Sequence, residues 1–291
     1  MRTNYHTHCE FCDGKASAAT MAETAAAKGY SVLGFSSHAP IPFETTWAIR
    51  EERLPEYAAE IRRLKKAWAP GGECAIQAGR SLEILLGLEI DWYEGLRSPR
   101  DALFDPIGLD YKLGSVHYIA PKGCLPFTVD SSAENFGRDA QAAIGGEGHL
   151  LYEDYYARLT RMIAEGGFDI VGHFDLVSRN NTDGRWFDED SPGYLSAAFA
   201  AAEALEGSPI VVEINLGGLA RGKMKRPHPS LPIVKRLKEL GVRVTFCADA
   251  HCPEHLGVHI DAARALAKAA GYESAAIFSG GVWSETGLDE V

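Results

Sequence analysis

Histidines that can bind a metal recur at one kind of position along the chain. His6 and His8 end the first short apolar run, and in a strand this spacing places both rings on one face. Glu89, near the end of another such run, adds a carboxylate. Neutral imidazole and carboxylate are common ligands of zinc, manganese and iron. Six of the ten histidines end an apolar run or follow it closely: His6, His8, His38, His117, His173 and His251.

The elements that must position these side chains are short apolar runs alternating with helical patterns. Strand followed by helix, repeated about seven times, predicts a mainly parallel sheet. At 291 residues, a closed α/β barrel fits better than an open sheet. The carboxyl ends of barrel strands form one mouth, so the six histidines and Glu89 are expected to converge there.

The predicted elements cover most of the chain. Two segments without a clear pattern, Trp92–Tyr111 and Ala120–Gly148, are predicted as long loops. The expected strands are Thr3–His8, Ser31–Ser36, Glu83–Ile90, Lys112–Tyr118, Asp169–His173, Ile210–Asn215 and Val242–Ala248, with a weaker eighth at Ala275–Phe278. The expected helices are Ala18–Lys28, Glu51–Trp68, Leu151–Glu165, Tyr194–Glu206, Leu231–Leu240 and Pro253–Ala270.

Composition and charge exclude several classes of function. The chain has 29 Lys and Arg against 40 Asp and Glu, a net charge of −11, which argues against a nucleic-acid or anionic-membrane partner. No apolar stretch approaches the ~18 residues that span a bilayer, and no signal-peptide core is visible. The six scattered cysteines are expected to be reduced thiols in a cytoplasmic protein. No linker divides the chain, so residues 1–291 are expected to form one domain.

These motifs, in this order and spacing, resemble the PHP (polymerase and histidinol phosphatase) superfamily. Within it, the chain is most similar to the monofunctional histidinol-phosphate phosphatases. The resemblance extends from residue 3 to about residue 260. It is carried by His6-Thr7-His8 with Phe11-Cys12-Asp13-Gly14, Ser37-His38-Ala39, Gly87-Leu88-Glu89, Gly114-Ser115-Val116-His117, Gly172-His173-Phe174-Asp175-Leu176, Glu213-Ile214-Asn215 with Leu219-Ala220-Arg221, and Ala248-Asp249-Ala250-His251.

The resemblance implies a distorted (β/α)7 barrel with two to three divalent transition-metal ions (Zn, Mn or Fe) at the mouth. Glu89 would bridge two ions, and Asp13 stands where many family members have a histidine. Glu89, Asp249 and His251 are the expected catalytic residues. The implied ligands are His6, His8, Glu89 and Asp249 for the first ion, Glu89, His117 and His173 for the second, and Asp13, His38 and His251 for the third.

The chemistry expected of this cluster is hydrolysis of a phosphate monoester. Two ions ~3.5–4 Å apart can share a hydroxide as nucleophile and also bind the phosphoryl oxygens. The leading hypothesis is cleavage of L-histidinol phosphate in histidine biosynthesis, by a monomer or small homo-oligomer. The alternatives are a phosphoesterase acting on another small phosphate, such as a nucleotide or sugar phosphate, and a non-catalytic metal-binding module.

Substrate contacts are predicted from residues near the strand ends. Arg221 and Arg179 can bind phosphate with two hydrogen bonds each, although either can equally be a solvated surface residue. Trp92, Tyr118 and Trp47 can form walls for the organic part of the substrate, although aromatic residues more often belong to the core. Cys9-x-x-Cys12 also allows a redox or zinc role, but no second such pair exists.

Overall fold

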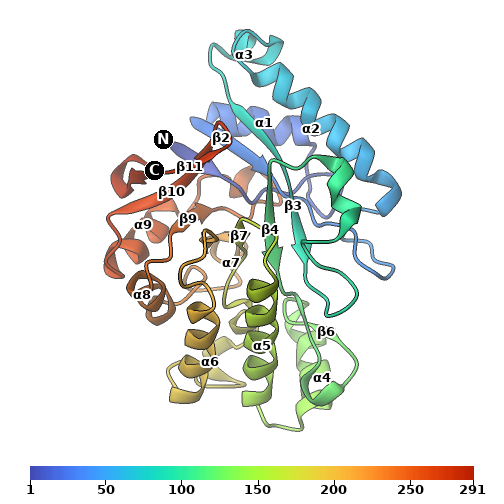
Figure 1. Cartoon of the computed structure of the whole chain (residues 1–291), viewed down its shortest axis with the longest axis vertical. Coiled ribbons are helices and arrows are strands. Elements are labelled where there is room, and N and C mark those ends of the chain that lie inside the picture. Colours follow the sequence, from blue (N-terminus) through green and yellow to red (C-terminus); the bar gives the residue numbers. More distant parts are fainter.

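A sheet of seven parallel strands forms the centre of the molecule, a computed structural model that describes residues 1–291 (Figure 1). The strands lie in the order β1-β2-β3-β4-β7-β8-β9. Their bounds are β1 Arg2–Asn4, β2 Tyr30–Phe35, β3 Glu83–Asp91, β4 Tyr111–Ser115, β7 Ile170–Val171, β8 Val211–Asn215 and β9 Val244–Cys247. All seven predicted strands are present, most of them shorter than predicted.

The sheet closes into a barrel just beyond the carboxyl ends of its first and last strands. A parallel bridge joins Thr7 to Ala250. In it, the backbone N–H of His8 donates to the Ala250 carbonyl at 2.9 Å, and that of Ala250 donates to the His6 carbonyl at 3.1 Å. This single bridge holds the His6–His8 segment beside the residues that follow β9. The predicted closed barrel is therefore confirmed, with its closure at the mouth.

Helices cover the outside of the barrel because each has one apolar side (Figure 1). In α5 the buried stripe includes Leu151, Tyr155 and Leu159, at four-residue spacing. The helices are α1 Ala18–Ala27, α2 Leu54–Trp68, α3 Glu73–Ala78, α4 Ala133–Ile144, α5 His149–Glu165, α6 Pro192–Glu203, α7 Gly217–Ala220, α8 Leu231–Glu239 and α9 Ile260–Ala269. None combines the length and the apolar character needed to cross a membrane.

The predicted eighth strand lies outside the barrel. It is β10 (Ser274–Ser279), which pairs antiparallel with β11 (Val282–Gly287). The backbone N–H of Phe278 donates to the Tyr5 hydroxyl at 2.7 Å, and the Trp283 ring lies 5.9 Å from that of Tyr5. The hairpin thus packs against Tyr5, whose side chain is buried inside the barrel. The two chain termini lie side by side, joined by a hydrogen bond from Met1 to Glu290.

The predicted loop Ala120–Gly148 is wrong over its second half, because it contains α4. The Ser132 hydroxyl caps this helix by accepting from the Asn135 backbone N–H at 3.2 Å. Phe136, Ala140 and Ile144 form its buried side at helical spacing. The same segment also holds the short strand β6 (Phe127–Thr128), which pairs with β5 (Tyr118–Ile119).

The predicted helix Pro253–Ala270 is also corrected. A 3-10 turn at Pro253–His255 is followed by a break, and α9 begins only after His259. His259 has a left-handed φ of 59°, which no helix interior accommodates. The predicted loop Trp92–Tyr111 contains no α-helix but does hold a 3-10 helix at Ala102–Ile107.

Close packing inside the barrel gives a first prediction. A Cβ atom on Gly87 would lie 2.5 Å from the Tyr111 ring, inside van der Waals contact. We expect Gly87→Ala to lower the free energy of unfolding by about 1–3 kcal/mol, because the ring has no room to move. Urea denaturation measures this change. The matched control is Gly287→Ala, where nothing lies within 4 Å of the added methyl. Equal stability of the two variants would contradict the packing argument.

Candidate metal centre

Nine side chains with metal-ligating atoms converge at the mouth of the barrel. They are the nine predicted ligands, and they come from the loops that follow five of the strands and from the strand β3 itself. Within each of four overlapping groups, the ligand atoms lie within 4.8 Å of one another. The groups are His6, Glu89 and His173; His6, His8 and Asp249; His38, Glu89 and His117; and His8, Asp13, His38 and His251.

Glu89 lies at the centre of the cluster and is 1% exposed. Its Oε2 atom lies 3.1 Å from His6 Nε2 and 3.0 Å from His38 Nδ1. Its Oε1 atom lies 2.9 Å from His173 Nε2. Burial opposes ionisation, but the surrounding imidazoles outweigh it and hold the pKa of Glu89 well below its usual value. The carboxylate is therefore charged and faces histidines on both of its oxygens.

Two acidic residues that sequence reasoning did not assign to the site hold the ligands in place. Glu213 accepts from the His6 ring at 2.9 Å and from the His173 backbone N–H at 2.7 Å. Asp91 accepts from Nδ1 of His117. A carboxylate on one imidazole nitrogen leaves the other nitrogen free to bind a metal. The sequence signal for Asp91 was the alternation of side chains along a strand, which places Asp91 on the same face as Glu89.

Several buried polar atoms of the cluster have no hydrogen-bond partner. Three of them are Nε2 of His8, Nδ1 of His38 and Oδ1 of Asp13. A buried polar atom without a partner is costly, and a divalent cation would satisfy all three. Burial and the imidazoles of His251 and His38 lower the pKa of His8 to about 3, so its ring is neutral and can act as a ligand. The donor set thus fits divalent transition metals.

Two cavities adjoin the cluster. One of about 360 Å³ is lined by several of the ligands together with Lys15, Arg179 and Arg221. The other, of about 240 Å³, is lined by Trp47, Tyr118, Thr128 and Ser131 beside His38 and His117. Asp130 lines both cavities and accepts from Arg179 at 3.0 Å. Cationic side chains and aromatic side chains therefore line two adjoining cavities at the same cluster.

Arg221 reaches the cluster directly. Its guanidinium donates to Oδ2 of Asp249 at 2.8 Å and to the Asp249 backbone carbonyl at 3.0 Å. Gly217 makes this possible, because a Cβ atom there would lie 2.4 Å from Asp249 Oδ2. The predicted positions of Arg221, Arg179 and Tyr118 beside the metal ligands are thus found in the structure.

The structure corrects the prediction made for Trp92. Its side chain is 5% exposed and belongs to the hydrophobic core, and its indole N–H donates to Glu165 of α5 at 2.7 Å. It lines neither cavity at the cluster. Glu89 and Asp91 face the barrel interior, so the alternation of a strand directs Trp92 outward to the helix layer. The prediction that Trp92 contacts substrate is therefore wrong.

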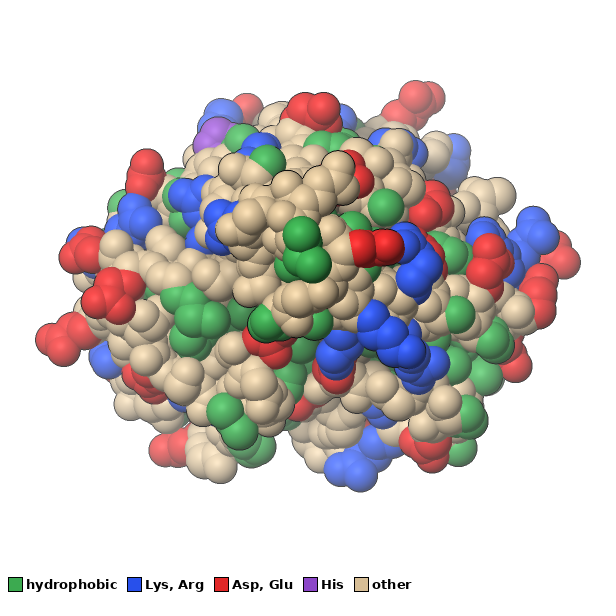
Figure 2. Space-filling model, turned by 90° about the horizontal axis from the view of Figure 1, so that it is seen from above, with side chains coloured by type: hydrophobic (Ala, Val, Ile, Leu, Met, Phe, Trp, Pro, Cys, Tyr) green, Lys and Arg blue, Asp and Glu red, His purple; other side chains and the backbone are tan.

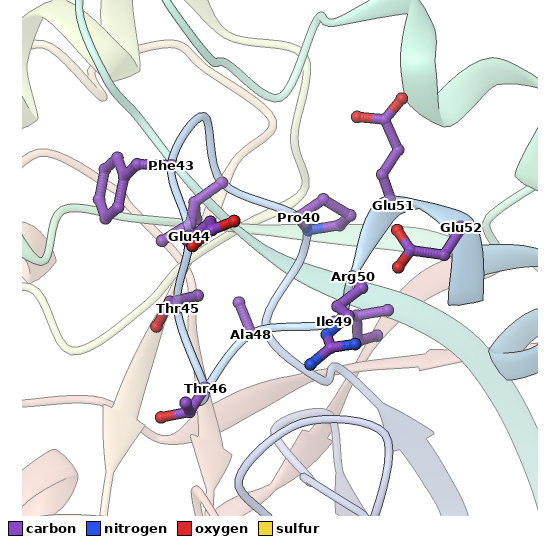
Figure 3. A pocket seen from close by; sticks show the side chains of 11 residues that line it. Pro40, Phe43, Glu44, Thr45, Thr46, Ala48, Ile49, Arg50, Glu51 and Glu52 are labelled. Atoms are coloured by element: carbon purple, nitrogen blue, oxygen red, sulfur yellow. The ribbon is translucent and has the colours of Figure 1, made fainter.

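A further cavity, of about 800 Å³, lies away from the cluster. It lies within the segment from Pro40 to Glu52, and Figure 3 shows Phe43 on one side with Glu51 and Glu52 on the other. None of the nine ligands lines it. On the face shown in Figure 2, basic side chains form separate groups interspersed with acidic ones.

A parallel α/β barrel with imidazoles and carboxylates gathered at its mouth defines the class of metal-dependent barrel hydrolases. The sequence profile of the PHP domain matches residues 4–216. The chain therefore belongs to the PHP domain family, as the motifs indicated.

Relatives and solved structures agree with this assignment. The "Probable histidinol-phosphatase" of Deinococcus radiodurans is 31% identical over 256 residues, covering 87% of each chain. The "Histidinol-phosphatase" of Bacillus subtilis is 24% identical, covering 88% of this chain and 96% of its own. The fold matches the crystal structure of histidinol phosphate phosphatase from Lactococcus lactis in complex with zinc, L-histidinol and phosphate, with a TM-score of 0.63. The two sequences are 20% identical, and the match covers 97% of this chain and 98% of that one.

Glu89 provides the test of this centre. We expect Glu89→Gln to reduce metal binding and to lower kcat at least ~10²-fold, about 2.7 kcal/mol in the barrier, because an amide cannot neutralise the cations on both sides. Elemental analysis of native protein purified without chelator should find more than one transition-metal ion per chain. The control is Glu94→Gln, a surface residue paired with Arg161. Full metal content and turnover in Glu89→Gln would contradict the central role of this carboxylate.

Proposed function

We propose that the protein is a metal-dependent phosphomonoesterase that hydrolyses L-histidinol phosphate to L-histidinol and phosphate in histidine biosynthesis. The observation that carries the proposal is the convergence of nine metal-ligating side chains on one site with Arg179 and Arg221 beside it. The names of the relatives support the substrate, as do the L-histidinol and phosphate bound to the Lactococcus lactis protein.

Two to three divalent ions, drawn from zinc, manganese and iron, would be held by the nine residues. The proposed sets are His6, His8, Glu89 and Asp249; Glu89, His117 and His173; and Asp13, His38 and His251. When bound, such ions lower the pKa of a water molecule and neutralise charge on the phosphoryl group. Asp249 and His251 complete a cluster that begins at His6, so residues 1–291 act as one domain in this proposal.

The residues of the chain have distinct roles in the reaction. Arg221 and Arg179 bind the non-bridging oxygens of the phosphate and hold it for in-line attack by water. Asp249, beside the same cavity, accepts the proton of the attacking water. A new bond forms between that oxygen and phosphorus, the ester bond from phosphorus to the alcohol oxygen breaks, and the alcohol oxygen takes up the proton that Asp249 accepted. Phosphate and L-histidinol are the products.

The second cavity fits the organic half of the substrate. Trp47 and Tyr118 provide aromatic walls for an imidazole ring, and Asp130 provides a carboxylate for the ammonium group. The Trp47 ring lies 4.8 Å from that of His38, so this wall directly adjoins the metal ligands. A substrate with phosphate at one end and an ammonium and aromatic ring at the other would span the two cavities.

A substrate panel tests the proposed function. Phosphate release should be at least tenfold more efficient, in kcat/KM, with L-histidinol phosphate than with AMP, fructose bisphosphate or an aryl phosphate. The protein would be assayed with zinc, manganese or iron supplied separately. Tenfold higher efficiency on another of these phosphates would contradict the assigned substrate. The protein would still be a phosphomonoesterase.

Variants of Arg221 separate phosphate binding from metal binding. We expect Arg221→Ala to raise KM and to lower kcat/KM about 10- to 10³-fold, and Arg221→Lys to recover part of this, because an ammonium lacks the two-pronged contact. Elemental analysis should show unchanged metal content. Lys223→Ala, an exposed cation on the same loop, is the control and should stay within about twofold. Loss of metal together with activity would contradict the phosphate-binding role.

A further inference from the structure

His8 belongs to two of the four ligand groups, and it cannot serve both in its neutral form. Its Nε2 atom lies 3.5 Å from Glu89 Oε2 and 3.5 Å from Asp249 Oδ1. Its Nδ1 atom lies 3.8 Å from Asp13 Oδ1. A neutral imidazole has a proton on one nitrogen and a lone pair on the other. The partner of the protonated nitrogen therefore decides which ion His8 binds.

The nearest partner of Nδ1 is the Cys12 thiol. Cys12 Sγ lies 3.4 Å from His8 Nδ1, closer than the Asp13 carboxylate. The same sulfur lies 3.5 Å from the Cys9 backbone carbonyl, which can only accept. The thiol proton therefore has an acceptor other than His8, and the sulfur lone pairs remain available to the ring. The other nitrogen, Nε2, is buried without a hydrogen-bond partner.

We propose that Cys12 is a positioning residue for the metal centre. The His8 Nδ1–H donates to Cys12 Sγ, and the Cys12 S–H donates to the Cys9 carbonyl. This relay leaves the lone pair on Nε2, which faces Glu89 and Asp249, so His8 binds the ion that it shares with His6. The outer ion is then held without His8, by Asp13, His38 and His251 only.

The relay explains the Cys9-x-x-Cys12 pair without redox or zinc chemistry. The Cys12 backbone N–H donates to the Cys9 carbonyl at 3.0 Å, which forms the turn that brings the thiol to His8. Cys9 itself points elsewhere, with its sulfur 3.3 Å from the Ser37 hydroxyl. Both sulfurs are free thiols. One cysteine thus orients a ligand, and the other contributes its carbonyl.

The hydrogen-bond partner of His8 differs in kind from those of His6 and His117. His6 and His117 donate to the carboxylates of Glu213 and Asp91, which are stronger acceptors than a neutral thiol. A carboxylate partner raises the basicity of a ligating imidazole, and a neutral thiol does so less. The strength of the bond from His8 to its ion therefore depends more on the orientation of the His8 ring than on the charge of its hydrogen-bond partner.

The test uses the zinc-loaded full chain and compares Cys12→Ala with Cys9→Ala. Cys9→Ala is the matched control, because it removes a thiol from the same turn and keeps the carbonyl. Loss of a partner of a metal ligand typically costs about 10- to 100-fold in affinity. We expect Cys12→Ala to lose one zinc ion at chelator concentrations lower by this factor. Cys9→Ala should stay within about twofold, and Cys12→Ser should fall between the two.

Nitrogen-15 NMR of histidine-labelled, zinc-loaded native protein gives a readout that needs no variant to fold. The relay predicts a proton on Nδ1 of His8 and zinc on Nε2. Zinc on Nδ1 would overturn the proposal, as would zinc affinity of Cys12→Ala within twofold of native. The inference rests on the proposed metal ligands but not on the proposed substrate. Both measurements are made without substrate, so failure of the histidinol assignment would leave them unchanged.

Discussion

The structure depends on burying one carboxylate among imidazoles. Glu89 is removed from water and stays charged only because histidines from four separate strand ends face it. A buried anion without such partners would be strongly destabilising, and so would a set of buried imidazoles without an anion or a cation. The barrel solves this by bringing parallel strand ends to one place. Its closing bridge at Thr7–Ala250 lies beside the same residues.

The supporting residues form a second ring around this centre. Glu213, Asp91 and Cys12 each contact one nitrogen of a ligating histidine and so determine which nitrogen faces inward. Ser115 donates to Glu89 at 2.7 Å and fixes the carboxylate itself. The chemistry of the site therefore depends on residues that never contact substrate. In the proposed function, specificity comes from other residues, Trp47, Tyr118 and Asp130, which line the second cavity.

The sequence predicts the barrel, the six histidines and Glu89 because strand ends appear as apolar runs followed by polar residues. The ligands Asp13 and Asp249 are implied by the family resemblance. The sequence does not predict side-chain direction beyond the strand, so Trp92 was placed on the wrong side of the sheet and Glu213 was not assigned to the site. The helix α4 was missed, although Phe136, Ala140 and Ile144 have helical spacing, because Gly137 interrupts the pattern and the surrounding segment is rich in Gly, Pro, Ser and Asp. Contacts such as Cys12 with His8 depend on turn geometry, which residue spacing alone does not reveal.

The central claim is that Glu89 lies between metal ions at the mouth of this barrel. Anomalous diffraction from crystals of the zinc-loaded protein, recorded on both sides of the zinc edge, tests it most directly. We expect more than one anomalous peak, with peaks on both sides of the Glu89 carboxylate and within bonding distance of the histidines around it. A single peak, or peaks away from Glu89, would contradict it.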